Sequence, residues 1–413
     1  MGLNASVVDH PKSQSRPLRS AFVAQLPLTV FAAVSCVTAL TLGQDDAIMK
    51  GSAAYWLLIV AALIPVFMSA GRWVNQAFSG FIWVSLFLLL SVAWSAIRGD
   101  GGSILPLLML SLSWLYSQCS SAQISAVTVA RLFVGLVVFG IGLKAVTNVN
   151  YYGILPWLAD DLRADGRVSF AGNIGFAGVI SLLVFVILIA QKTRSPIIWF
   201  ALALSVYFVF FSRVRTALIG VALFGVMYWI LSDRRPASAR SYFIIGVSVV
   251  ALTIVAISVA PLLLVSVHSA GWASDFFLQG KQSLSADDIQ EQLYRPVLWA
   301  TQLQLFLSSP YLMGWGSAAA TMIETAGSTF LSGGDTVSFP TRLLAHHGLP
   351  GVLFIWAAMR ALWRHAKARD VASVCAWPVC VLVMLSWGSI FHPTDAVGVL
   401  YLILTFRGVS AFK

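Results

Sequence analysis

The sequence predicts an all-α polytopic membrane protein with about 12 transmembrane helices and one large, partly helical external loop. Three observations predict this fold class. Of the 413 residues, 59% are apolar and 10% are charged, whereas a soluble globular protein carries about 25% charged residues. The mean hydropathy is +0.85, and long apolar runs recur along the chain. This composition excludes a cytosolic enzyme, a disordered chain and a basic nucleic-acid binder, and four cysteines are too few for a disulfide framework.

Twelve apolar runs are candidates for membrane spans. A membrane-crossing helix needs roughly 20 apolar residues, because the hydrocarbon core is about 30 Å thick and a helix rises about 1.5 Å per residue. The runs cover 21–42, 52–70, 78–97, 104–118, 125–146, 169–190, 196–211, 216–232, 242–267, 348–363, 371–390 and 396–412. Several are short, and the shortest is 104–118. The late first run, without a small-residue cleavage site, is not typical of a signal peptide.

These spans divide the chain into four parts. Residues 1–20 are expected to form a cytoplasmic tail, 21–267 to hold spans 1–9, 268–347 to form the large external loop, and 348–413 to hold spans 10–12 and a cytoplasmic C-terminus. This orientation leaves 16 of the 26 Lys and Arg residues and three of the 16 acids on the cytoplasmic side. An excess of basic residues there is what membrane insertion favours.

The external loop is about eighty residues long, which is more than a connection needs, so we expect it to fold and to carry function. A capping pattern that starts at Ser283 leads into residues 289–307, where apolar residues recur at helical spacing. Pro310 is expected to end this helix. The segment 317–331 is weakly amphipathic and predicts a helix on the outer surface.

Arginines on the external side run against the charge bias. They are Arg98, Arg163, Arg167, Arg213, Arg215, Arg295 and Arg342. The clearest pair, Arg213 and Arg215, falls between two spans that need only a tight turn. An arginine in the bilayer costs at least ~2.5 kcal/mol, so this pair either extends to lipid headgroups or binds phosphate, whose oxygens match the guanidinium fork.

Other candidate residues also have two interpretations. Arg295 is able to pair with Glu291 one helical turn earlier, and Arg167 with Asp165. His346 and His347 titrate near neutrality, but a histidine at a membrane edge is more often a structural contact. Trp299 is able to stack on a sugar or to pack in the core of the loop. No nucleotide motif, Asp-x-Asp signature or metal-spaced His/Cys cluster is visible, so no cofactor and no metal is expected.

Three stretches carry a resemblance to a known family. They are Ser212-Arg-Val-Arg-Thr-Ala-Leu-Ile-Gly220, Tyr294-Arg-Pro-Val-Leu-Trp299 followed by Phe306-Leu-Ser-Ser-Pro-Tyr-Leu-Met-Gly-Trp-Gly316, and Pro340-Thr-Arg-Leu-Leu-Ala-His-His-Gly-Leu-Pro-Gly351. In order and position they resemble the bacterial O-antigen ligase and polymerase superfamily of integral-membrane glycosyltransferases. Arg167 with residues 170–173 is similar to a fourth element. The resemblance covers residues 165–365.

The chain departs from the ligase branch at one position. A histidine of that branch would fall about ten residues before Gly348, where this chain has Ser338. His346 and His347 directly precede the glycine instead, so the ligase histidine has no match. This difference favours the polymerase branch.

The resemblance implies a GT-C-like architecture in the bacterial inner membrane, with the site facing the periplasm. It implies a metal-independent transferase that polymerises oligosaccharide repeat units carried on undecaprenyl diphosphate, for O-antigen or exopolysaccharide. Arg213, Arg215 and Arg295 would hold the diphosphate. Arg167, Arg342, Tyr294, Trp299, His346 and His347 would bind substrate. The implied partners are the lipid-linked oligosaccharide and membrane lipids, with a chain-length regulator and a flippase as optional additions and no nucleic acid.

Two other functions stay open. One is ligation of the finished glycan to lipid A–core or to protein, which uses the same donor. The other is a transporter or flippase, which would place charged residues in the middle of spans. Arg131, Lys144 and Arg407 all fall near span ends, and no internal repeat is visible.

Overall fold

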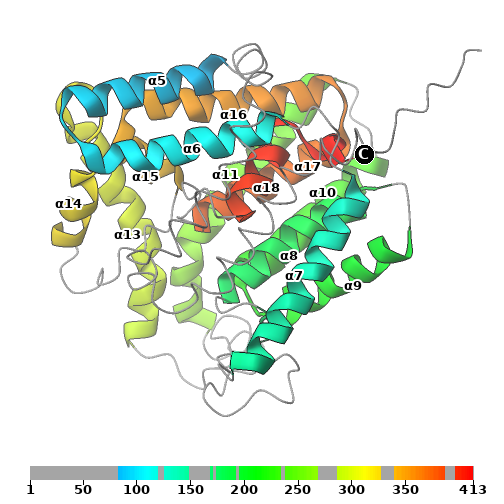
Figure 1. Ribbon diagram of the computed structural model, residues 1–413. Coiled ribbons are helices and arrows are strands. Elements are labelled where there is room, and N and C mark those ends of the chain that lie inside the picture. The colour runs from blue at the N-terminus through cyan, green and yellow to red at the C-terminus, as the bar shows by residue number, and fades with distance from the viewer. Residues whose placement is uncertain are drawn as a thin grey trace, which may run out of the picture.

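The computed structural model describes residues 82–119, 125–147, 168–170, 174–191, 195–233, 238–267, 286–326, 339–386 and 396–412. These residues are almost entirely helical, and no β-strand occurs among them (Figure 1). The fold class is therefore all-α, as predicted. The first two expected spans, 21–42 and 52–70, lie outside the described residues, as does the tail before them.

Each of the ten other expected spans coincides with a helix. These helices are α5 (Ile82–Ile97), α6 (Gly101–Cys119), α7 (Ala126–Thr147), α8 (Ile174–Ile189), α9 (Pro196–Phe211), α10 (Arg215–Asp233), α11 (Ala239–Val267), α16 (Leu349–Lys367), α17 (Val371–Ser386) and α18 (Ala396–Phe406). Apolar periodicity and length therefore located the helices, but the last expected span, 396–412, was too long, because α18 ends at Phe406 and the chain turns into a separate 3-10 helix.

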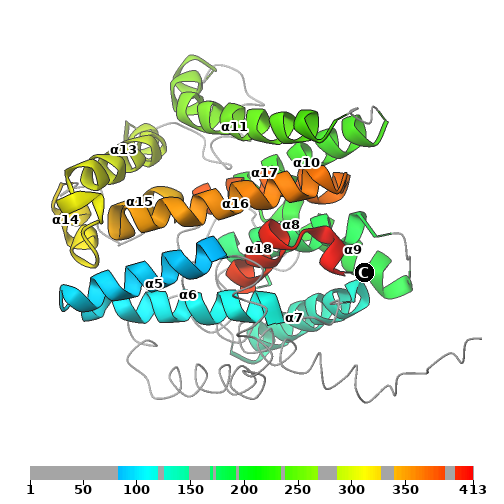
Figure 2. The same cartoon turned by 90° about the horizontal axis from the view of Figure 1, so that it is seen from above.

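Two of these helices are long and apolar enough to cross a membrane. They are α10 and the first 21 residues of α11, Ala239–Val259. Both present large apolar side chains outward: Trp229 on α10 is 72% exposed and Leu252 on α11 is 67% exposed. Figure 2 shows α11 along one edge of the bundle, where only one side packs on other helices. Such an exposed apolar face suits contact with lipid.

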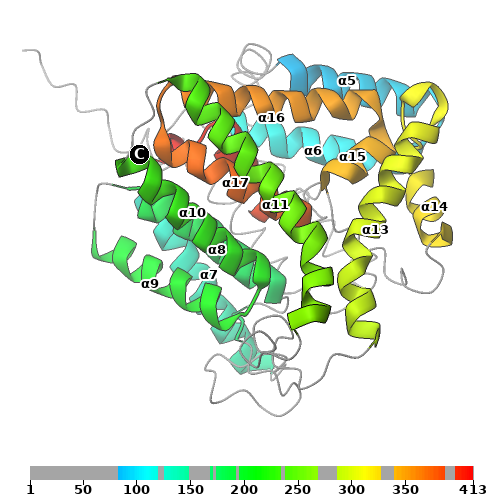
Figure 3. The same ribbon diagram turned by 180° about the vertical axis from the view of Figure 1, so that it is seen from behind.

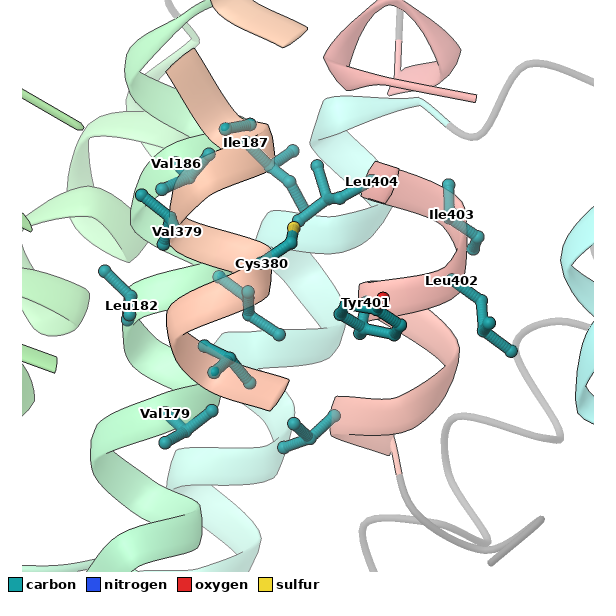
Figure 4. Packing of buried hydrophobic residues seen from close by; sticks show 14 of the residues in the cluster. Val179, Leu182, Val186, Ile187, Val379, Cys380, Tyr401, Leu402, Ile403 and Leu404 are labelled. Carbon is teal, nitrogen blue, oxygen red and sulfur yellow. The ribbon is translucent and has the colours of Figure 1, made fainter. Parts of the chain in front are cut away.

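The centre of the bundle is α17, with α8 and α18 beside it. Every side chain of α17 from Ser373 to Leu385 is buried, and Figure 4 shows Val379 and Cys380 of α17 between Leu182 of α8 and Tyr401 of α18. A Pro residue at 378 removes one backbone donor inside the helix. The indole of Trp377 donates to the Ala358 carbonyl at 3.1 Å and so joins α17 to α16.

The segment 268–347, which is expected to form the external loop, contributes three described helices and one short 3-10 turn. They are α13 (Ala286–Ser308), η1 (Pro310–Leu312), α14 (Ala318–Ala326) and α15 (Phe339–His347). The helix expected over 289–307 and its end before Pro310 are confirmed, and α14 covers the first part of the segment expected to be helical. Helices α13, α14 and α15 gather at one end of the bundle (Figures 1 and 3), which we call the loop end.

The opposite end carries the C-terminus and is called the tail end. There the chain turns back after α18 into η2 (Val409–Phe412) and lies on the α16–α17 turn. The backbone N–H of Val409 donates to the Ser373 hydroxyl at 2.8 Å, and Arg364 donates to the Phe406 carbonyl at 3.1 Å. Of the candidate site residues, Trp299 on α13 and Arg342, His346 and His347 on α15 fall at the loop end.

Candidate functional site

The α9–α10 turn, which carries Arg213 and Arg215, lies at the end of α10 that is away from the tail end. At the tail end, Phe243 near the start of α11 packs edge-on against Trp363 near the end of α16, with 5.5 Å between ring centroids. The C-terminus of α10 leads directly into α11 and is therefore at the tail end too. A 19-residue helix is about 28 Å long, so Arg215 at the start of α10 is at the opposite end.

Packing holds this turn in one tight conformation. Ser212 is buried and its N–H donates to the Phe208 carbonyl at 3.0 Å, while the Val168 N–H donates to the Phe211 carbonyl at 2.9 Å. A Cβ added at Gly178 of α8 would lie 2.7 Å from the Val214 side chain. The close approach of α8 therefore depends on glycine at that position.

The two arginines of the turn differ in exposure. Arg213 is exposed and has a φ of +52°, a left-handed conformation that non-glycine residues seldom adopt. Arg215 begins α10 and is half-buried. Backbone strain of this kind is common where a side chain must point in a particular direction. The turn thus presents two cations, one to solvent or headgroups and one nearer the bundle.

Helix α15 brings Arg342 and His346 to the loop end on one face, four residues apart. Burial lowers the pKa of Arg342 below its ordinary 12.5. Burial, and then the charge of Arg342, hold the pKa of His346 well below its ordinary 6.5. His346 is therefore neutral at neutral pH, and its buried Nε2 has no hydrogen-bond partner within the part of the chain that the structure describes.

His347 lies on a different face of α15 and is part of the core. Its side chain is 6% exposed, and its ring meets Phe87 of α5 edge-on with 5.8 Å between centroids. Burial, and then the charge of Arg342, lower its pKa to about 4. These surroundings favour the structural interpretation of His347 over substrate binding.

A second set of polar groups lies between α13 and α15. The Thr341 hydroxyl of α15 donates to the side-chain oxygen of Gln302 on α13, a residue that is fully buried. The Nε2 of Gln302 and the indole Nε1 of Trp299, one turn earlier on α13, have no acceptor among the described residues. Buried N–H groups of this kind normally have a partner, yet these two have none among the described residues although the side chains are 8% exposed at Trp299 and 0% at Gln302.

Three predicted site residues are not placed by side chain. Tyr294 and Arg295 belong to α13, but their side chains lie outside what the structure describes, and Arg167 lies outside the described residues altogether. Their roles stay predictions. The structure brings Arg342, His346 and Trp299 to the packed α13–α15 pair, while α17, which contacts both α10 and α15, connects this pair to the α10 helix of Arg215.

Sequence reasoning missed Gln302 and Thr341. The signal for Gln302 was its spacing: it falls three residues after Trp299, on the apolar face of the helix where a polar residue needs a reason. Thr341 has no comparable signal, because the hydroxyl is paired across two segments that the sequence separates by 39 residues. Within the described residues, no group of three or more His, Cys, Asp or Glu side chains is arranged to hold a metal ion.

Comparison of the chain with models of known protein families finds no match, and comparison with curated proteins finds none.

Proposed function

We propose that this chain is a multi-pass membrane glycosyltransferase that extends glycans carried on a polyprenyl diphosphate, at the external face of a bacterial inner membrane. The observation that carries the proposal is that two helices with candidate cations both pack on the buried helix α17. One is α10, which begins at Arg215 directly after the turn of Arg213, and the other is α15, which carries Arg342 and His346. The apolar helices α10 and α11 support contact with lipid.

In the proposed reaction, an acceptor sugar hydroxyl attacks the anomeric carbon of the donor glycan, and the bond from that carbon to the diphosphate breaks. Negative charge then builds on the leaving diphosphate. Guanidinium groups stabilise that charge most when they are already in place. Arg213, Arg215 and Arg295 are proposed for this role, with Arg167 and Arg342 as supporting cations.

The acceptor would bind between α13 and α15. The N–H groups of Trp299 and Gln302 are suited to hydrogen bonds with sugar oxygens, and Tyr294 is proposed to line the same site. His346 is suited to orienting the acceptor hydroxyl. Because its pKa is held well below 6.5, it is a weak proton acceptor at neutral pH, so positioning contributes more to this proposal than general-base catalysis.

Reconstitution tests the proposal. Purified protein in liposomes, given undecaprenyl-diphosphate-linked repeat units but no nucleotide sugar, should produce a ladder of longer lipid-linked glycans. Arg215→Ala should abolish the ladder without lowering expression, and Arg215→Lys should restore little because the fork geometry is lost. Movement of the lipid across the bilayer without any elongation would contradict the proposal and support a flippase.

A gene deletion separates the polymerase from the ligase of the same family. Loss of a polymerase leaves single repeat units on the final acceptor, whereas loss of a ligase leaves none. We expect single units.

A further inference from the structure

The α5–α6 turn forms hydrogen bonds with a segment of the expected external loop that lies 216 residues further along the chain. The guanidinium of Arg98 donates to the Gly314 carbonyl at 2.9 Å and to the Trp315 carbonyl at 3.4 Å. The carboxylate of Asp100 accepts from the Ser317 N–H at 2.8 Å and from the Ser317 hydroxyl at 2.5 Å. A cation and an anion of one turn thus hold both sides of the 314–317 segment.

The 314–317 segment in turn caps the C-terminal end of α15. The N–H of Trp315 donates to the Ala345 carbonyl at 2.9 Å, and the N–H of Gly316 donates to the His346 carbonyl at 2.9 Å. The last carbonyls of a helix have no partner inside the helix, so α15 ends on donors supplied by the 314–317 segment. The indole of Trp315 also donates to the Leu305 carbonyl of α13 at 2.9 Å.

Glycine makes this close approach possible. Gly316 has a φ of +62°, and a Cβ there would lie 1.9 Å from the Asp100 carboxylate. Gly348, which follows α15, has a φ of +61°, and a Cβ there would lie 2.1 Å from the Leu312 carbonyl oxygen. Gly348 lies against the backbone of residues 312–314 and Gly316 against the side chains of Asp100 and Ser103, so neither position has room for a side chain.

We propose that Arg98 and Asp100 are positioning residues, which hold the 314–317 segment so that it caps α15 and fixes Arg342 and His346 at the loop end. The contacts alone support the fixing of α15 by this segment, whereas the effect of Arg98 and Asp100 on catalysis rests on the proposed function. The guanidinium of Arg98 thus has a structural role, since it donates to two carbonyls of this segment.

The charge state of Asp100 supports this role. Burial alone would raise the pKa of Asp100, but hydrogen bonds from Ser317 and Ser103 outweigh it and lower the pKa from 3.8 to about 2. The carboxylate is therefore ionised at neutral pH, where it accepts the hydrogen bonds from Ser317 and Ser103.

Asp100→Asn tests the proposal, because Asn has one acceptor oxygen where the carboxylate has two, and all four groups that reach Asp100 are donors. A matched control exists at the tail end. Asp370 accepts from the Ser373 N–H at 3.2 Å and from its hydroxyl at 2.6 Å, as Asp100 does from Ser103 at 3.2 Å and 2.7 Å. Asp370→Asn therefore removes the same helix cap without touching the loop.

Hydrogen exchange by mass spectrometry on the full chain in nanodiscs is the first readout. Asp100→Asn should speed exchange of the Trp315 and Gly316 amides about tenfold or more, because charge-assisted hydrogen bonds are the stronger ones. Asp370→Asn should leave these amides unchanged. Unchanged exchange in Asp100→Asn, or an equal rise in both variants, would overturn the proposal.

Elongation of lipid-linked repeat units is the second readout. Asp100→Asn should lower kcat about tenfold with little change in KM for the lipid-linked donor, and Asp370→Asn should stay within twofold of wild type. Arg98→Lys should retain more activity than Arg98→Ala. If Asp100→Asn shows faster amide exchange but keeps the wild-type kcat, the proposed effect of Asp100 on catalysis is wrong. If the wild-type protein elongates no glycan, the proposed function is wrong. The hydrogen-exchange result would still test whether Asp100 fixes the 314–317 segment against α15.

Discussion

At the scale of single residues, the external arginines have one side-chain chemistry and different surroundings. Arg98 donates to two loop carbonyls, Arg342 is largely withdrawn from solvent on α15, and Arg213 is exposed in a left-handed backbone conformation. The sequence grouped them only by side of the membrane. The contacts of Arg98 assign it a structural role, and anion binding by the others stays a proposal.

The buried His347 makes stability depend on pH. Its pKa is 6.5 in the unfolded chain and about 4 in the folded one, so between these values the unfolded state binds more protons. Stability is then complete above pH 6.5 and is lost as the pH falls toward 4, by up to about 3 kcal/mol. Thermal unfolding in detergent at pH 7 and at pH 5 measures the effect. His347→Leu should show a smaller drop, and an equal drop in both proteins would contradict the assignment.

Substitution of the Gln302–Thr341 pair is able to separate an effect on stability from an effect on function. An unsatisfied buried donor costs about 1–3 kcal/mol, and replacing both partners of a buried pair by apolar groups of similar shape is often neutral or stabilising. The double variant Gln302→Met/Thr341→Val should therefore unfold at or above the wild-type temperature and still lose elongation activity, through a raised KM for the acceptor. Full activity in a stable double variant would show that the pair is only structural.

At the scale of elements, local sequence patterns predicted the helices but not the contacts between distant segments. Apolar periodicity placed α10 and α11, and Pro310 correctly marked the end of α13. The sequence marked Gly314 and Gly316 as turn residues, but the partners of that turn, Asp100 and His346, come from distant segments. Contacts between distant segments depend on the packing of the whole bundle, so no local signal encodes them.

The glycine contact between α5–α6 and the loop predicts a position-specific effect. Gly316→Ala adds a methyl group where the backbone is left-handed and the Asp100 carboxylate is in the way, and it should destabilise the protein by about 2 kcal/mol or more. Thermal unfolding measures this loss. Gly101→Ala, at a neighbouring glycine with nothing within 4 Å of the added Cβ, is the control and should be neutral. Similar losses in both variants would contradict the packing argument.

At the scale of the whole molecule, the two ends of the bundle should face opposite sides of the membrane. Arg213 in the α9–α10 turn and Arg369 at the tail end form a matched pair, because both are exposed and both have a φ near +50°. In a background without native cysteines, Arg213→Cys should react with an impermeant maleimide added outside spheroplasts. Arg369→Cys should react only after permeabilisation. The reverse pattern would invert the proposed orientation.

The central claim is that guanidinium groups of the candidate site bind a diphosphate. A measurement of affinity for the lipid diphosphate tests this claim most directly. Native mass spectrometry of the purified protein should find undecaprenyl diphosphate bound at least about tenfold more tightly than undecaprenyl monophosphate. Arg215→Ala should remove this preference, Arg215→Lys should weaken it, and Arg360→Ala, at an exposed arginine of α16, should keep it. Equal affinity for the two lipids, or an undiminished preference in Arg215→Ala, would contradict the account.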